Sequence, residues 1–227
     1  MSITPALLIW AAATSGSLPP IDGALLNLGD ACYAIRTTED GGKDAGHVLR
    51  RVERIDDKRL MITVVSRFNG GSLLTSRMDV AFPSLRPIRT IEQTDGQTGL
   101  SVRYRDTDVK GTATDEDGQS QTTIVPLPGP VWDDETIEFV LTALPLADGA
   151  HFEIPVFHFG RGVSVTTIDV RRSTEAAGSI PAWEIEASTR TDMAITFTVS
   201  QTNRQLLAID VGGVRSILGG DCSELGK

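Results

Sequence analysis

The stretch "DDETIEFVLTALPLADGAHFEIPVF", residues 133–157, holds the clearest change of pattern in the chain. Its first half places four apolar residues on one side of a helix, three and four positions apart: Ile137, Val140, Leu141 and Leu144. Asp133 or Asp134 suits the N-cap of such a helix, and Pro145 cannot continue it. We therefore predict a helix over residues 134–144, followed by a glycine turn and a strand.

Outside this helix the chain has the pattern of short β-strands separated by glycine-rich turns. Apolar and polar residues alternate in "GLSVRYR" (99–105), "AWEIEAS" (182–188) and "AITFTVS" (194–200). Successive side chains of a strand point to opposite faces, so each of these strands has one apolar and one polar face. The pattern predicts a mainly β protein built on an antiparallel sheet that is solvated on one face.

The charge of the chain excludes one large class of partners. The 227 residues carry a formal net charge of −9, whereas proteins that bind nucleic acid need clustered Lys and Arg. Residues 36–110 differ from the rest, with 14 basic and 11 acidic residues. Arginines on the wet face of this region ordinarily serve solubility, and a shared anion site is the alternative. The arginines concerned are Arg67, Arg77, Arg86, Arg89, Arg103 and Arg105.

The two cysteines, Cys32 and Cys222, lie near opposite ends of the folded region. Chain termini often lie close together, so a single disulfide formed in an oxidising compartment is one interpretation. Two unrelated reduced thiols are the other interpretation, and the residues alone do not separate the two.

The first 24 residues form a segment of their own, ahead of a single β domain over residues 25–227. Its apolar run Ile3–Ala13 is similar to the core of a secretory signal, although no Lys or Arg precedes Arg36. The alternative is a lead-in segment that packs on the domain. The run is too short to span a bilayer as a helix, and we predict no membrane span elsewhere.

No motif of a known catalytic or metal site occurs in the chain. His151 and His158 are close in sequence, and Pro155 between them is expected to interrupt the strand. A metal site would need a third ligand, such as His47, Glu153 or Asp169. We therefore predict no metal and no cofactor, and we favour a protein without catalysis. A hydrolase or lyase that uses the His151 and His158 region, with Glu153, is the alternative.

Several motifs, taken in order, resemble a family of secreted bacterial β proteins known only as a domain of unknown function. They span roughly residues 25–218 and include "LNLGDACYAIR", "VAFPSLRPIRTIE", "VRYRDTDVKGTATDEDG", "WDDETIEFVLTALPLADG", "FEIPVF", "GSIPAWEIEA" and "TFTVSQTNRQLLAIDV". The resemblance implies a curved antiparallel sheet, a half-barrel or open barrel similar in shape to the periplasmic lipoprotein carriers. In such folds one central helix covers the concave face, which suits the apolar stripe of residues 137–144.

A curved sheet covered by a helix can enclose an apolar cavity. The expected function is therefore a periplasmic or secreted envelope protein that binds a lipid or another apolar or amphipathic small molecule. The residues expected to line the site are Ile137, Val140, Leu141, Leu144, Phe152, Trp183 and Phe197. A structural or protein-interaction module is the alternative, and the sequence identifies no protein partner.

Overall fold

The structure is a computed structural model that describes residues 18–39, 42–115, 117–173, 180–188 and 194–225. Most of the segment 1–24, residues 1–17, lies outside this part. The strands are β1 (Gly29–Thr37), β2 (Asp44–Asp56), β3 (Arg59–Phe68), β4 (Leu73–Ala81), β5 (Pro87–Thr94), β6 (Gln97–Tyr104), β7 (Asp108–Thr114), β8 (Ser120–Pro126), β9 (Trp132–Asp133), β10 (His151–His158), β11 (Gly162–Ser173), β12 (Ala182–Ser188), β13 (Ala194–Ser200), β14 (Leu206–Val211) and β15 (Val214–Leu218). The helical elements are the 3-10 turns η1 (Gly23–Leu25) and η2 (Asp134–Thr136) and the helix α1 (Ile137–Thr142).

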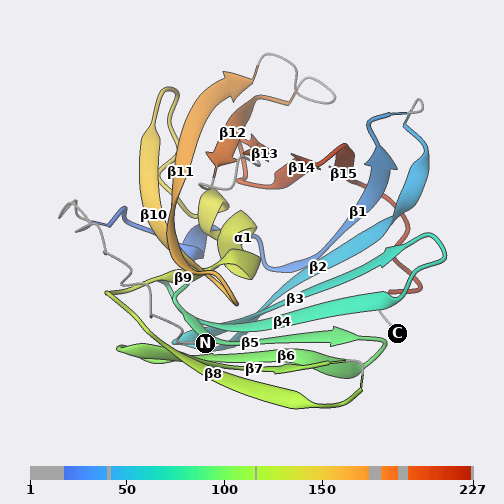
Figure 1. The fold of residues 1–227 in the computed structure, drawn as a ribbon. Coiled ribbons are helices and arrows are strands. Elements are labelled where there is room, and N and C mark those ends of the chain that lie inside the picture. Colours follow the sequence, from blue (N-terminus) through green and yellow to red (C-terminus); the bar gives the residue numbers. More distant parts are fainter. Residues whose placement is uncertain (1–17, 40–41, 116, 174–179, 189–193, 226–227) are drawn as a thin grey trace, which may run out of the picture.

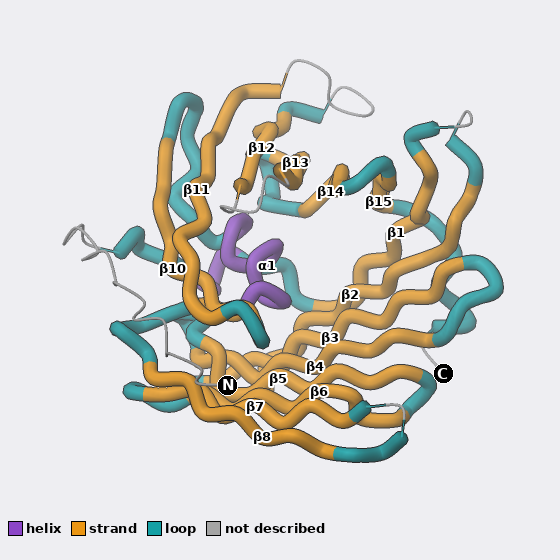
Figure 2. Tube along the Cα trace, viewed as in Figure 1, coloured by secondary structure: helices purple, strands orange, loops and turns teal. Residues whose placement is uncertain are grey.

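In the described residues the fifteen strands belong to one sheet, in the order β8-β7-β6-β5-β4-β3-β2-β1-β15-β14-β13-β12-β11-β10-β9. The two halves of the chain meet where β1 pairs with β15, and β8 and β9 remain as the two edges. Neighbouring strands are antiparallel except β9 and β10. The sheet curls around α1 without closing into a barrel (Figures 1 and 2). The predicted mainly β fold, with an open curved antiparallel sheet and a central helix, is confirmed.

The helix itself is shorter than the predicted 134–144. Asp133 belongs to β9 and caps the turn η2, because its side chain accepts a hydrogen bond from the Glu135 backbone N–H at 2.9 Å. α1 then covers only Ile137–Thr142. The Ala143 and Leu144 N–H groups bond three residues back, which tightens the last turn before Pro145. The predicted helix is therefore a 3-10 turn, an α-helix and a tightened end in succession.

The prediction that Pro155 interrupts the strand is wrong. β10 pairs with β11 in unbroken register from His151 opposite Asp169 to His158 opposite Gly162. Pro155 lacks an N–H donor, which the strand tolerates because β9 pairs only with Val156 and Phe157 on the other side. On this unbroken strand His151 and His158 point to opposite faces.

Two cores result from the curl, because β10 is buried on both faces. On one face Ile154 and Val156 join the main core around α1. On the other face Phe157 joins Val102 of β6 and Val109 of β7 in a second core. A Cβ on Gly111 of β7 would lie 2.0 Å from the Phe159 ring, so only glycine permits this approach. The sheet therefore overlaps itself, with β6 and β7 lying outside β10.

The disulfide between Cys32 and Cys222 is present, with a Cα–Cα distance of 5.8 Å. It attaches the segment after β15 to β1, alongside hydrogen bonds between Gly219 and the backbone of Cys32 and Ala34. A disulfide of this kind fits a protein of an oxidising compartment. Within the described ranges no helix is long and apolar enough to cross a membrane.

Candidate functional site

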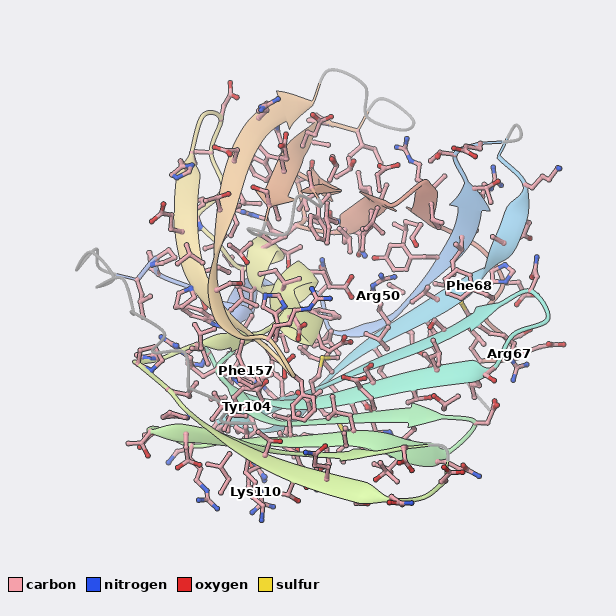
Figure 3. The ribbon with its side chains drawn as sticks, viewed as in Figure 1. Arg50, Arg67, Phe68, Tyr104, Lys110 and Phe157 are labelled. Atoms are coloured by element: carbon pink, nitrogen blue, oxygen red, sulfur yellow. A yellow bond between two sulfur atoms is a disulfide. The ribbon has the colours of Figure 1, made fainter. Side chains whose placement is uncertain are left out.

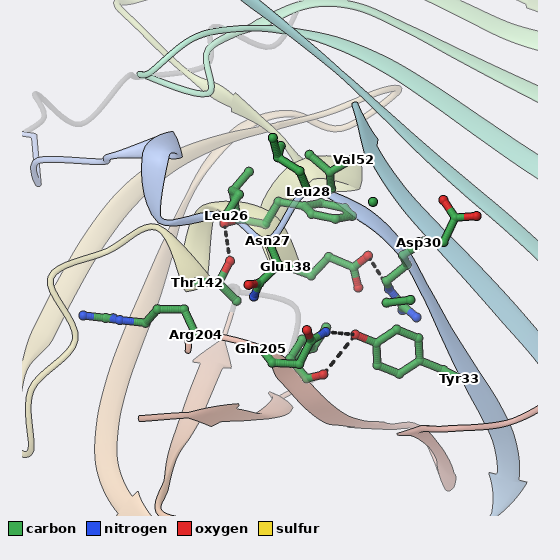
Figure 4. A pocket seen from close by; sticks show the side chains of 15 residues that line it. Leu26, Asn27, Leu28, Asp30, Tyr33, Val52, Glu138, Thr142, Arg204 and Gln205 are labelled. Atoms are coloured by element: carbon green, nitrogen blue, oxygen red, sulfur yellow. Dashed lines mark hydrogen bonds and ion pairs between the residues drawn. The ribbon is translucent and has the colours of Figure 1, made fainter. Parts of the chain in front are cut away.

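A cavity of about 80 Å³ lies between α1 and the concave face of the sheet, at β1, β2 and the start of β14 (Figure 4). One part of its wall is apolar and includes Leu26, Leu28, Val52, Phe139 and Leu206. Another part carries polar groups from Tyr33, Arg50, Glu138, Thr142 and Gln205. The cavity thus presents both an apolar surface and hydrogen-bonding groups, as a site for an amphipathic molecule would.

Arg50 is the central polar group of this wall. Only 8 % of the residue is exposed, and its Nε donates to Glu138 Oε1 at 2.7 Å. Its guanidinium also lies over the Tyr33 ring, 4.4 Å from the centroid. Burial acts to lower the pKa of Arg50, but the Glu138 carboxylate outweighs it, so the pKa is raised. Arg50 therefore stays charged and is neutralised by Glu138.

The Nη1 atom of Arg50 is buried and has no hydrogen-bond partner. A buried donor left unsatisfied costs about 1–3 kcal/mol, so such groups are rare in folded proteins. The neighbouring Tyr33 hydroxyl, by contrast, donates to the Leu206 carbonyl at 2.9 Å. Burial raises the pKa of Tyr33 to about 12, so this hydroxyl remains protonated. The unused donor of the site is therefore Arg50 Nη1.

Strand periodicity explains how Arg50 comes to face the cavity. Val48, Arg50 and Val52 share one face of β2, and the two valines belong to the main core. The alternation in "VLRRV" was therefore a usable signal that one arginine points inward. The sequence prediction missed it because it considered arginines only on the wet face of the sheet.

None of the seven residues predicted to bind ligand lines this cavity. Val140, Leu141 and Leu144 are fully buried in the main core, and Phe197 belongs to the same core. Ile137, Phe152 and Trp183 are partly buried and pack against it. The predicted apolar stripe thus serves helix packing, and the cavity is lined by other positions of the helix: Glu138, Phe139 and Thr142.

The two histidines of β10 have separate carboxylate partners. His151 Nδ1 lies 2.9 Å from Asp169 Oδ1 at an exposed position. His158 is 17 % exposed at its side chain, and its Nδ1 lies 2.9 Å from Asp134 Oδ2. Its Nε2 lies 3.0 Å from Ser164 Oγ, which completes a carboxylate–imidazole–hydroxyl chain. The described residues contain no cluster of His, Cys, Asp or Glu that could hold a metal ion.

A group of carboxylates lies at the start of the helix, next to the Asp134–His158–Ser164 hydrogen-bonded chain. Asp133 is 2 % exposed and accepts hydrogen bonds from the Thr90 and Tyr104 hydroxyls and from the Glu135 N–H. Burial raises the pKa of Asp133 to about 6 despite these bonds. Desolvation, followed by repulsion from Glu92, raises the pKa of Glu135 to about 8. Glu135 nevertheless keeps an exposed surface, so solvent screens part of this effect and we assign no free energy to its shift.

Residues 32–213 match the sequence model of a family described as "Protein of unknown function (DUF3108)". No curated protein matches the chain. Among solved structures, the chain is similar to the crystal structure of a beta-barrel-like protein of domain of unknown function DUF1849 from Brucella abortus. The TM-score is 0.53 at 12% sequence identity, over 86% of this chain and 97% of that chain. At this identity the similarity shows a shared fold.

Proposed function

The chain belongs to the DUF3108 family of proteins of unknown function, and we propose that it is a bacterial envelope protein that binds an amphipathic ligand without catalysis. The ligand would lie between the sheet and α1, in the cavity beside Arg50. A periplasmic or secreted location is part of the proposal and is supported by the disulfide between Cys32 and Cys222.

The observation that carries the proposal is the buried and unsatisfied Nη1 donor of Arg50, a residue that lines the cavity. A ligand oxygen that reached this atom, after a small movement of the side chains that cover it, would recover the free energy that the unpaired donor costs. The apolar wall formed by Leu26, Phe139 and Leu206 would remove part of an alkyl chain from water, at about 0.8 kcal/mol for each buried CH₂.

The charge balance of the site favours a neutral head group. Glu138 already neutralises Arg50 through the 2.7 Å ion pair. A ligand carboxylate would approach Glu138 as well as Arg50, and like charges in a buried site repel strongly. An ester carbonyl, an amide or a hydroxyl can accept from Nη1 without this repulsion. Neutral amphiphiles should therefore bind more tightly than fatty acids of the same chain length.

The size of the cavity limits how much ligand it can hold. Sites for drug-sized ligands usually measure roughly 300–1,000 Å³, whereas this cavity measures about 80 Å³. It would therefore hold the head group and the first few carbons of one chain. The rest of the chain would lie outside the cavity or displace side chains that pack around α1.

Isothermal titration calorimetry with monolaurin and laurate tests this proposal. The wild type should bind monolaurin, and laurate more weakly. The double variant Arg50→Met/Glu138→Gln, which removes the donors without leaving a buried carboxylate unpaired, should lose monolaurin binding. Arg161→Met, at an exposed position, should bind like the wild type. Absence of monolaurin binding, or equal binding by the double variant, would remove the support for this site.

A second candidate function rests on the Asp134–His158–Ser164 chain. A carboxylate that orients an imidazole, which in turn contacts a hydroxyl, is the arrangement that activates serine nucleophiles. Here His158 Nε2 would take the Ser164 Oγ proton during attack on an acyl carbonyl. Labelling with a fluorophosphonate and hydrolysis of p-nitrophenyl butyrate test this function, with Ser164→Ala as the inactive variant and Ser66→Ala as control. A Ser164 that reacts with neither reagent would exclude it.

A further inference from the structure

The outer face of β5, β6 and β7 carries a shallow hollow of about 210 Å³, on the other side of the sheet from the second core. Every side chain that lines it is a cation or bears a hydroxyl: Arg89, Ser101, Arg103, Arg105, Lys110 and Thr112. Figure 3 shows Lys110 pointing away from the interior, whereas Tyr104 and Phe157 lie inside. We call these six residues the basic hollow.

Three cations of the basic hollow lie directly opposite one another across three strands. Arg89 of β5 faces Arg103 of β6, and Arg103 faces Lys110 of β7. Like charges at directly opposed positions of a sheet destabilise it. Asp79 of β4 lies directly opposite Arg89 on its other side, but among the described residues no ion pair or hydrogen bond joins Arg89, Arg103 or Lys110 to a carboxylate. Asp79 offsets the charge at the Arg89 end of the row, and the directly opposed Arg103 and Lys110 have no such neighbour, so their contact is unfavourable in the protein alone.

Some other exposed arginines have a carboxylate partner, whereas Arg36 and Arg77 have none among the described residues. Arg51, Arg59 and Arg215 pair with Asp30, Asp56 and Asp210, respectively. Within the basic hollow only Arg105 has a carboxylate partner, Asp108, at 3.7 Å. The chain as a whole carries a net charge of −9, so a row of unpaired cations stands out against an acidic surface. An anion from outside the chain is the partner that this row lacks.

We propose that the basic hollow binds a phosphate-bearing anion. Strands lie about 4.8 Å apart, so a phosphate over β6 can accept from guanidinium groups on two neighbouring strands. The hydroxyl-bearing residues Ser101 and Thr112 face each other in the adjacent row and offer two more donors. The free phosphate and the phosphate of a lipid head group share this chemistry. Ile124, 61 % exposed and opposite Lys110, would contact the lipid in the second case.

This site is independent of the cavity beside Arg50, and its test uses the whole protein. Pyrophosphate is titrated by calorimetry at low salt, and binding to vesicles is measured by sedimentation. One set of vesicles contains equal amounts of phosphatidylglycerol and phosphatidylcholine, and the other phosphatidylcholine alone. Binding to pyrophosphate identifies a free anion as a sufficient ligand, and binding only to phosphatidylglycerol vesicles identifies a lipid head group. Either result supports the site when variants of the hollow reduce it.

The variants are Arg103→Gln and Lys110→Gln, with Arg215→Gln as a control at an exposed arginine elsewhere. Arg103 lies between the other two cations, so Arg103→Gln removes one charge-assisted contact to the anion. This variant should weaken binding about tenfold. The control should bind like the wild type, and all three should keep the wild-type melting temperature within a few degrees. Binding of neither pyrophosphate nor phosphatidylglycerol vesicles, or equal loss in Arg215→Gln, would overturn the proposal.

Discussion

Replacement of Asp133 by Asn should change how the stability of the protein depends on pH. Asp133 is 2 % exposed, and burial raises its pKa from the ordinary 3.8 to about 6. A shift of roughly two units corresponds to about 3 kcal/mol at 1.36 kcal/mol per unit. Because the pKa is raised in the folded state, protonated Asp133 contributes this free energy to the stability of the fold. The contribution is fully present below pH 3.8 and is lost as the pH rises through 6.

The Asn variant cannot ionise at this position, so it should lack that loss. Measured against wild type, its free energy of unfolding should therefore rise by about 2.5 kcal/mol between pH 4 and pH 7. Removal of the Asp133 charge also relieves repulsion that helps to raise the pKa of Glu135, which acts in the same direction. The absolute stability of the variant is a separate matter, because Asn accepts the hydrogen bonds of Thr90 and Tyr104 less well.

Urea unfolding at several pH values, followed by tryptophan fluorescence, measures this difference. Asp57→Asn, at an exposed turn, serves as the control and should run parallel to the wild type. A difference between Asp133→Asn and wild type that stays constant across the pH range would refute the reasoning. It would mean that Asp133 is ionised in the folded protein as readily as in the unfolded chain.

Two further predictions concern the fold. Gly111→Ala should destabilise the protein by about 1–3 kcal/mol, because its Cβ would meet the Phe159 ring. The control Gly99→Ala should be tolerated, because open space surrounds that position. Equal melting temperatures for the two variants would show that β7 does not pack on Phe159. Replacement of both Cys32 and Cys222 by Ser should lower the free energy of unfolding by about 2–5 kcal/mol. Reductant should lower the melting temperature of the wild type but not of this variant, and a wild type indifferent to reductant would contradict the prediction.

The sequence predicted the parts of the fold that depend on local periodicity. Val102 and Tyr104 face inward on β6, and Ile185 and Phe197 face the main core, as their alternation with polar residues indicated. The disulfide was one of the two interpretations that the two cysteines left open, and the structure shows it. The strand faces are decided by neighbours in the sequence, whereas the pairing of the cysteines depends on how the chain ends come together.

The overlap of the sheet was not foreseeable in the same way. Phe157 packs against β6 and β7, and this contact depends on how far the sheet curls before its edge meets the interior. The helix was predicted too long because its first turn, η2, and its end at Ala143 and Leu144 have 3-10 hydrogen bonds, which the spacing of apolar residues does not distinguish from α-helix. The strand at Pro155 continues because β9 is short, which local sequence does not show.

The candidate site was only partly within reach of the sequence. The phase of Arg50 with Val48 and Val52 marks it as inward-facing, but its ion pair with Glu138 joins residues 88 apart in the chain. The contact between His158 and Ser164 follows from the tight turn between β10 and β11, which the glycines at 160 and 162 permit through their positive φ angles. Neither the Arg50–Glu138 contact nor the His158–Ser164 contact can be predicted from the local sequence without knowledge of how the strands pair.

The most direct test of the central claim is a crystal structure of the protein with monolaurin bound. The account predicts a glycerol or ester oxygen within hydrogen-bond distance of Arg50 Nη1, with the first carbons of the chain against Phe139 and Leu206. Monolaurin bound at another place, with Arg50 Nη1 still unpaired or bonded only to ordered water, would contradict it.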